Sequence, residues 1–183
     1  MDGINGIAAT TGIVAFSGIG FVTWKFHDQA NISYLAFGIA IACLGFLPFN
    51  FPNAKVFMGD VGSILLGFLF AGLVILISND FKDLICYSSF LFLFYADEIT
   101  TMAERIKDKQ SLISPHRRHL YQILVNEREI AHWKVTTIYG FAQILISILM
   151  IRISQTSFLT IFATLVCLMM LFVIINNKIK KNR

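Results

Sequence analysis

The chain has 183 residues, of which 56% are hydrophobic and 14% are charged, and its formal net charge is +4. A soluble globular domain is about 45–50% apolar and about 25% charged, so this composition excludes an ordinary soluble protein. The apolar residues form runs of about 17–20, the length that a helix needs to cross a bilayer core. The three cysteines lie far apart inside these runs, which gives neither a metal-binding spacing nor a disulfide framework. We therefore expect an all-α integral membrane protein.

Six candidate transmembrane spans follow one another and form a single membrane domain over residues 1–183. They are Ile7–Trp24, Ser33–Phe49, Val61–Ser78, Leu84–Ala96, Val135–Ile151 and Ser157–Ile175. The fourth run is short in apolar residues, and we expect its helix to continue through Glu104 into the following loop.

The distribution of lysine and arginine predicts the orientation of these spans. Six spans place both termini, the 50–60 loop and the 97–134 loop on one face, which carries twelve cations: Lys55, Arg105, Lys107, Lys109, Arg117, Arg118, Arg128, Lys134, Lys178, Lys180, Lys181 and Arg183. The opposite face carries three: Lys25, Lys82 and Arg152. The excess predicts that the first face is cytoplasmic. The polar stretches lie on that face while the spans carry little charge, so we expect an interfacial site.

The stretch from Asn50 to Ser63 reads Asn-Phe-Pro-Asn-Ala-Lys-Val-Phe-Met-Gly-Asp-Val-Gly-Ser between two apolar runs. Asp60 directly precedes an apolar helix, and its position alone leaves helix capping and metal binding equally open. A lone hard oxygen ligand suits Mg²⁺, which keeps waters and shares its shell with substrate phosphates. Gly59 and Gly62 would let a phosphate approach a helix N-terminus. Lys55 offers a mobile cation for phosphate, or simply extends along the membrane interface.

A second polar stretch, residues 114–122, reads Ser-Pro-His-Arg-Arg-His-Leu-Tyr-Gln. Ser114 and Pro115 predict a helix start, with His116, Arg117 and Arg118 in its first turn and His119 on the same face as His116. Cations oppose the dipole at a helix N-terminus, so this arrangement suggests a bound anion such as a diphosphate. The alternative is a basic loop that rests on anionic lipid headgroups.

Two further polar positions are less informative. Asp2-Gly3-Ile4-Asn5-Gly6 describes a tight loop that enters a helix, and a cap and a turn explain it fully. Asp97 and Glu98 end the fourth apolar run, where they can simply mark the point at which the helix leaves the lipid.

Three motifs carry a resemblance to a known family. Residues 2–8, Asp-Gly-Ile-Asn-Gly-Ile-Ala, resemble an Asp-Gly-x-(Asn/Asp)-Gly-Leu-Ala loop. Residues 52–63 are similar to a Mg²⁺ motif in which Pro-Ala is usual, with one residue inserted between Pro and Ala. Residues 116–122 resemble a histidine loop of the form His-Arg-x-His-x-Tyr-Gln. In this order they resemble the polyprenyl-phosphate N-acetylhexosamine-1-phosphate transferases (glycosyltransferase family 4). The histidine loop, with Asp97 and Thr101, points to the O-antigen-initiating type.

The resemblance implies transfer of N-acetylhexosamine 1-phosphate from a UDP-N-acetylsugar to undecaprenyl phosphate, with release of UMP. This step initiates cell-envelope polysaccharide synthesis at the bacterial inner membrane, and no nucleic acid is involved. The resemblance implies that Asp60 binds Mg²⁺ or Mn²⁺ and that Phe57 stacks on uracil. It assigns catalysis to Asp2, Asp60, His116 and His119, and substrate binding to Asn5, Asn50, Lys55, Phe57, Arg117 and Arg118.

One feature departs from the family. Its members have ten or eleven spans and an Asp-Asp motif on an earlier cytoplasmic loop, whereas this sequence has no adjacent Asp-Asp. We therefore expect the chain to correspond to the C-terminal part of such a transferase, as a truncated or split gene product. It would work with a separately encoded N-terminal half or as a homodimer. The alternative is a non-catalytic membrane remnant; a transporter is a third hypothesis.

Overall fold

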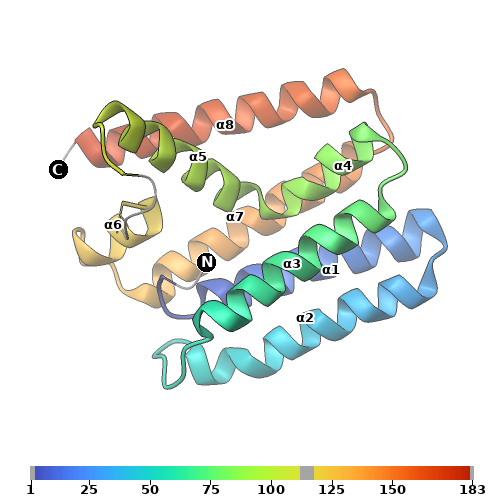
Figure 1. Ribbon diagram of the computed structural model, residues 1–183, viewed down its shortest axis with the longest axis horizontal. Helices are drawn as coiled ribbons and strands as arrows, with labels where there is room; N and C mark the ends of the chain where they lie inside the picture. Colours follow the sequence, from blue (N-terminus) through green and yellow to red (C-terminus); the bar gives the residue numbers. More distant parts are fainter. Residues whose placement is uncertain (1–2, 112–117, 182–183) are drawn as a thin grey trace.

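In the computed structural model, which describes residues 3–111 and 118–181, the chain is a bundle of long helices (Figure 1). The α-helices are α1 Ile7–Val22, α2 Ala30–Asn50, α3 Gly59–Ile77, α4 Phe81–Ser88, α5 Phe92–Lys107, α6 Leu120–Asn126, α7 His132–Ile153 and α8 Phe158–Lys181. A π-helical segment, Thr23–His27, extends α1, and a 3-10 turn, Ser89–Leu91, joins α4 to α5. No strand occurs in these residues. The predicted all-α integral membrane fold is confirmed.

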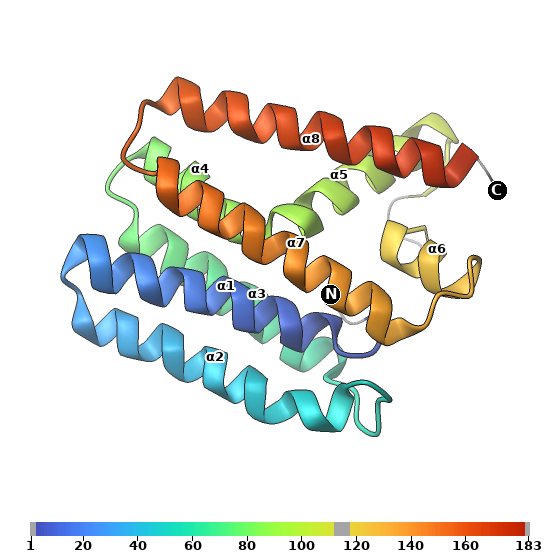
Figure 2. The same cartoon turned by 180° about the vertical axis from the view of Figure 1, so that it is seen from behind.

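Helix α1 is the centre of the bundle, because it packs against α2, α3 and α7 (Figures 1 and 2). Its Phe16 side chain is fully buried and meets Phe70 of α3 edge to face, with ring centroids 6.2 Å apart. Helices α2, α3 and α8 lie at the outside and expose apolar side chains such as Phe68 and Leu159. Lipid is as apolar as these side chains, so such exposed surfaces suit a bilayer.

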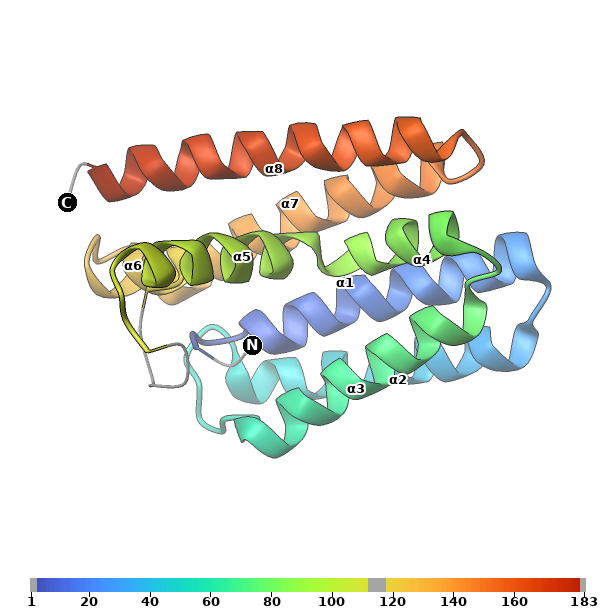
Figure 3. The same ribbon diagram turned by 45° about the horizontal axis from the view of Figure 1, so that its top comes forward.

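Five helices are long and apolar enough to cross a membrane: α1 with its π-helical extension, α2, α3, α7 and α8. The fourth predicted span, Leu84–Ala96, differs, because it is not one helix. Helices α4 and α5 together run from one end of the bundle to the other with the 3-10 turn between them (Figure 3). The expectation that this segment continues beyond Glu104 is confirmed, since α5 ends at Lys107.

The interruption between α4 and α5 is explained by one side chain on another helix. The side-chain amide of Gln143 on α7 accepts a hydrogen bond from the backbone N–H of Leu93 (3.1 Å) and donates one to the carbonyl of Ser89 (3.1 Å). A group inserted into the backbone ladder is a recognised cause of a helix break. The break therefore depends on a contact with a helix fifty residues further along the chain.

The N-terminal loop, the 51–58 loop, α6 and the C-terminal end of α8 gather at one end of the bundle (Figures 1 and 3). These segments were predicted to lie on one membrane face, and they do lie at one end of the bundle. That this face is cytoplasmic stays a prediction. The N-terminal end of α3, which carries Asp60, lies at the same end.

Candidate functional site

Asn50, the last residue of α2, joins the first two motifs. Its Oδ1 accepts the backbone N–H of Gly6 at 2.6 Å, and its Nδ2 donates to the carbonyl of Val56 at 2.7 Å. Gly6 has a φ of 78°, a conformation that favours glycine, and a Cβ there would lie 2.7 Å from the Phe51 ring. The buried Asn50 amide thus holds the N-terminal loop against the 51–58 loop.

Asn5 anchors the N-terminal loop to helix α7. Its backbone N–H donates to Nδ1 of His132 at 3.2 Å, and its carbonyl accepts from Thr136 Oγ1 at 2.7 Å. Its side-chain amide also donates to the Pro52 carbonyl at 3.3 Å, in an exposed position. The loop is therefore fixed on two sides, by α7 and by the 51–58 loop.

The N-terminal loop also packs on α6, which follows the third motif. Ile4 and Ile7 form a buried apolar cluster with Tyr121 of α6 and with Tyr139 of α7. A Cβ on Gly3 would approach the Tyr121 ring to 2.7 Å, so the contact is close. Together with the Asn50 bonds, this packing brings described parts of all three motifs into one assembly.

Asp97 on α5 is the most buried carboxylate of this assembly, with 1% of its surface exposed. Both carboxylate oxygens accept the backbone N–H of Leu120, the first residue of α6, at 2.9 and 3.1 Å. Thr101 Oγ1 lies 3.5 Å from Oδ1. A carboxylate at a helix N-terminus is stabilised by the exposed N–H groups and the helix dipole, so Asp97 fixes where α6 begins.

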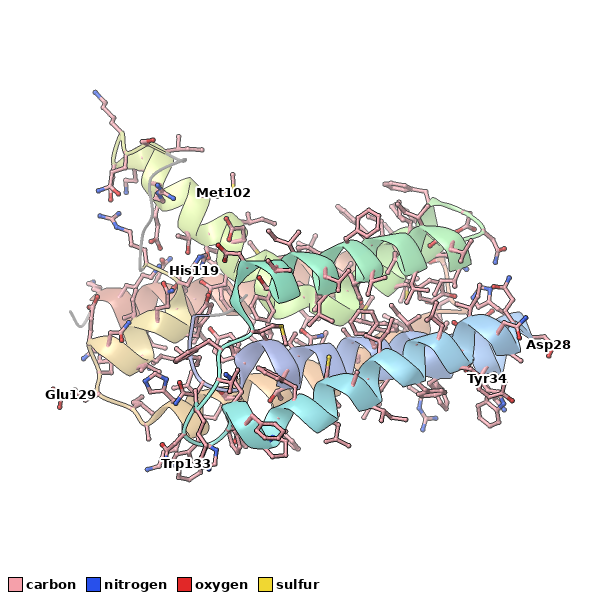
Figure 4. The ribbon with its side chains drawn as sticks, turned by 60° about the horizontal axis from the view of Figure 1, so that its bottom comes forward. Asp28, Tyr34, Met102, His119, Glu129 and Trp133 are labelled. Carbon is pink, nitrogen blue, oxygen red and sulfur yellow. The ribbon has the colours of Figure 1, made fainter. Side chains whose placement is uncertain are left out.

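His119 precedes α6 and lies between two carboxylates (Figure 4). Its Nδ1 is 3.8 Å from Asp97 Oδ1, and its Nε2 is 3.7 Å from Glu98 Oε2. Its ring stacks on Tyr121 with a centroid separation of 5.4 Å and an interplanar angle of 2°. These groups line a cavity of about 190 Å³ formed by Phe94, Tyr95, Asp97, Glu98, His119 and Tyr121.

The predicted helix start at Ser114 and Pro115 lies outside the described residues, but the expectation that Arg118 belongs to the first turn of that helix is wrong. Helix α6 begins at Leu120 with His119 as its N-cap, so Arg118 and His119 precede the helix. A bound anion was expected at this helix N-terminus. The Asp97 carboxylate is one such anion, because it accepts the first backbone N–H of α6, that of Leu120. Asp97 therefore does more than mark the point where α5 leaves the lipid.

Asp60 lies in the first turn of α3 and is exposed. Met58 is the N-cap residue, so capping, one of the two roles considered for Asp60, is not the role that the structure shows. Gly59 has a φ of 67°, which favours glycine, and nothing lies within 4 Å of the position a Cβ would take there. The space beside Gly59 is therefore open, and the neighbouring Asp60 residue is exposed.

The donor set around Asp60 is compatible with Mg²⁺ but not with a fully protein-bound metal. The described residues contain no cluster of three or more His, Cys, Asp or Glu side chains that could hold a metal ion. Mg²⁺ commonly binds through one or two carboxylates and takes the rest of its shell from water and phosphate oxygens. An exposed carboxylate beside an open helix start fits that pattern.

The remaining predicted site residues are distributed around this end. Lys55 and Phe57 are exposed in the 51–58 loop, and 65% of the Phe57 surface is accessible. Arg118 forms an ion pair with Asp108. Asp2, His116 and Arg117 lie outside the described residues, and their roles stay predictions.

Gln143 was not identified from the sequence, and Asp97 was left ambiguous. A single glutamine within the apolar run Val135–Ile151 was an available signal, because a polar side chain inside a span needs a hydrogen-bond partner. The partners themselves lie on a different helix, so the pattern along α7 does not reveal them.

Comparison with known proteins supports the resemblance. Residues 1–78 match the model of glycosyl transferase family 4. Three similar proteins are all named phospho-N-acetylmuramoyl-pentapeptide-transferase. That of Microcystis aeruginosa is 35% identical over 150 residues, 76% of this chain and 38% of the relative. That of Staphylococcus saprophyticus is 31% identical over 146 residues, which cover 76% of this chain and 44% of the relative. That of Levilactobacillus brevis is 39% identical over 79 residues, which cover 43% of this chain and 24% of the relative. The aligned part thus spans less than half of each relative.

Proposed function

Because residues 1–78 match the model of glycosyl transferase family 4, we propose that this protein takes part in transferring a sugar 1-phosphate from a UDP-N-acetylsugar to undecaprenyl phosphate. An oxygen of the lipid phosphate attacks the phosphorus atom that carries the sugar. The bond from that phosphorus to the oxygen of uridine monophosphate breaks, and UMP leaves with the electron pair. A new P–O–P bond joins the sugar phosphate to the lipid phosphate.

The observation that carries this proposal is the convergence of the three motifs at one end of the bundle. Asn50 binds the N-terminal loop to the 51–58 loop, and Tyr121 packs the histidine loop's helix onto the N-terminal loop. Segments more than a hundred residues apart are thus joined at one end of the bundle. Phosphoryl transfer depends mainly on positioning and on neutralisation of charge, and the polar residues of these segments would supply groups for both.

Asp60 is the residue that would hold Mg²⁺. When bound, the ion would neutralise charge on the diphosphate. Lys55 lies in the same loop and would contact a phosphate oxygen, while the exposed Phe57 ring would stack on the uracil. His119, held beside Asp97 and Glu98, would donate a hydrogen bond to the diphosphate from the opposite motif. Arg118 would bind the same diphosphate after its ion pair with Asp108 is broken.

The lipid substrate requires an apolar surface beside this polar one. An apolar cavity of about 310 Å³ lies between α5, α6, α7 and α8, and its lining includes Leu120, Leu124, Tyr139 and Phe172. Leu120 belongs both to this cavity and to the N-terminus of α6, next to His119. The cavity therefore offers a place for the first isoprene units of undecaprenyl phosphate, with its headgroup near the histidine loop.

Two different UDP-sugar substrates are supported, each by a different observation. The His-Arg-Arg-His-Leu-Tyr-Gln form of the histidine loop favours a UDP-N-acetylhexosamine and an O-antigen-initiating role. The relatives named phospho-N-acetylmuramoyl-pentapeptide-transferase favour a donor that carries N-acetylmuramoyl-pentapeptide. We place the N-acetylhexosamine donor first, because the loop contributes directly to the site.

The sequence contains no adjacent aspartate pair, which the family places on an earlier loop. We therefore propose that turnover also requires the part of the family's fold that carries this pair, at the bacterial inner membrane and on its cytoplasmic side.

The test measures UMP release in proteoliposomes with undecaprenyl phosphate, Mg²⁺ and either UDP-N-acetylglucosamine or UDP-N-acetylmuramoyl-pentapeptide. The chain is assayed alone and together with the polypeptide sequence encoded directly upstream, fused to it or separate. UMP release with the first donor supports the proposal, and release with only the second selects the other donor. No release under any of these conditions refutes the transferase and favours a non-catalytic remnant.

A further inference from the structure

We propose that Gln143, on helix α7, is a positioning residue for the histidine loop because it holds the break between α4 and α5. The predicted effect of Gln143 on UMP release rests on the proposed function. Its predicted effect on the direction of α5 does not. Gln143 touches neither substrate nor metal in this account. It acts through α5, which carries Asp97.

The Gln143 amide replaces one specific backbone hydrogen bond. In an uninterrupted α-helix the N–H of Leu93 bonds to the carbonyl four residues earlier, which is that of Ser89. Here Gln143 Oε1 takes the N–H of Leu93, and Gln143 Nε2 donates to the carbonyl of Ser89, both at 3.1 Å. Nε2 also lies 3.3 Å from Ser147 Oγ. The side chain is 98% buried, with 2% of its surface exposed, so water does not share these bonds.

The direction of α5 depends on the backbone hydrogen bond that the Gln143 amide replaces. Ser89 and Leu93 are the i and i+4 partners of an uninterrupted helix. The Ser89 carbonyl also accepts the N–H of Phe92, but the Leu93 N–H would lose its acceptor without Gln143, and an unsatisfied N–H is costly in an apolar span. Without the Gln143 amide, the two groups would bond to each other, and the segment would close into a straighter helix. The amide is therefore what keeps α5 at its angle to α4.

The distance from this break to the site is one helical turn. Leu93 precedes Asp97 by four residues, or about 6 Å along the helix axis. Asp97 accepts the Leu120 N–H and lies 3.8 Å from His119 Nδ1. A change in the direction of α5 therefore moves Asp97 away from the start of α6 and changes its position relative to His119.

The test compares three variants of the full chain in lipid vesicles. Gln143→Met keeps the length of the side chain and removes the amide. Gln143→Glu retains both functions in its neutral form, which an apolar span favours. Ser147→Ala removes only the additional 3.3 Å contact and is the matched control.

Two readouts are recorded for each variant. The first is a pulsed electron paramagnetic resonance distance between spin labels at Met102→Cys on α5 and Trp133→Cys on α7, both partly exposed (Figure 4). The native Cys43, Cys86 and Cys167 are replaced by alanine for this measurement. The second is the steady-state rate of UMP release, resolved into kcat and KM for the UDP-sugar.

We expect Gln143→Met to shift or broaden the label distance and to lower kcat about a hundredfold, as small displacements of catalytic groups do, with KM for the UDP-sugar changed less than about threefold. Gln143→Glu and Ser147→Ala should match the unsubstituted protein in both readouts. An unchanged distance in Gln143→Met overturns the inference, and so does a lower kcat without a changed distance. If Gln143→Met does not fold, Gln143→Ala removes the same amide without added bulk and decides the question.

The two proposals fail separately. The label distance needs no turnover, so a shifted distance in a chain that releases no UMP refutes the proposed function and leaves the geometric inference standing. An active protein whose Gln143→Met variant keeps its distance and its kcat refutes the inference alone.

Discussion

The carboxylate of Asp97 on α5 accepts the backbone N–H of Leu120, with its two oxygens at 2.9 and 3.1 Å. These residues are 23 positions apart, and the contact joins the broken transmembrane segment to the short helix behind the histidine loop. Because the carboxylate is buried, its hydrogen bond is not weakened by competition with water. This contact sets the position of His119 relative to the rest of the site.

Replacement of Asp97 should separate its structural role from its charge. Asp97→Ala leaves the Leu120 N–H without its acceptor and should lower stability by about 1–3 kcal/mol. Asp97→Asn retains an acceptor and should cost less stability while still lowering UMP release, because the negative charge beside His119 is lost. Thermal unfolding in detergent and the UMP assay measure the two effects. The matched control is Asp28→Asn at the opposite end of the bundle (Figure 4), which should change neither quantity.

We expect Asn50 to stabilise the structure of the site through its hydrogen bonds to two loops, and not mainly to contact substrate. Asn50→Ala leaves the Gly6 N–H and the Val56 carbonyl without their partner, and we expect a loss of about 1–3 kcal/mol. The 51–58 loop should also become more sensitive to protease. Asn53→Ala, at an exposed position in the same loop, is the control and should leave both properties unchanged. Equal protease sensitivity in the two variants would contradict the role given to Asn50.

The ion pair between Glu104 on α5 and Lys180 on α8 should make only a small contribution. Lys180 Nζ lies 2.7 Å from Glu104 Oε2, and Asn176 donates to the same carboxylate at 3.1 Å. Because the pair is partly exposed, we expect a coupling free energy of no more than about 1 kcal/mol, weakened by added salt. A double-mutant cycle of Glu104→Gln and Lys180→Met measures it. A coupling that is much larger or independent of salt would show that the pair is shielded from water.

The long helices and the shared end of their loops could be predicted from the sequence, because hydrophobic run length and the bias of Lys and Arg are local properties. The break in the fourth span could not, because its cause is the Gln143 amide on a different helix. The placement of Arg118 was wrong for a similar reason. It was expected in the first turn of a helix, but it precedes α6, which begins at Leu120, where Asp97 on α5 accepts the backbone N–H.

The roles of individual site residues were predictable to different degrees. The 51–58 loop and Asp60 were identified from composition and from the motif, and the structure places both at the shared end. Asn50 was assigned to substrate binding, yet its amide is buried and bonded to two loops, which no one-dimensional pattern distinguishes from a ligand-facing asparagine.

The proposed role of Asp60 is to hold Mg²⁺ during phosphoryl transfer between a UDP-sugar and undecaprenyl phosphate. This role is tested by Mg²⁺-dependent release of UMP by the protein and by its Asp60→Asn variant, in the same vesicles and with the same upstream-encoded sequence. We expect chelation of Mg²⁺ to abolish release and Asp60→Asn to lower it by at least about a hundredfold, the scale seen when one charge-stabilising group is removed. Full release by Asp60→Asn would contradict this role.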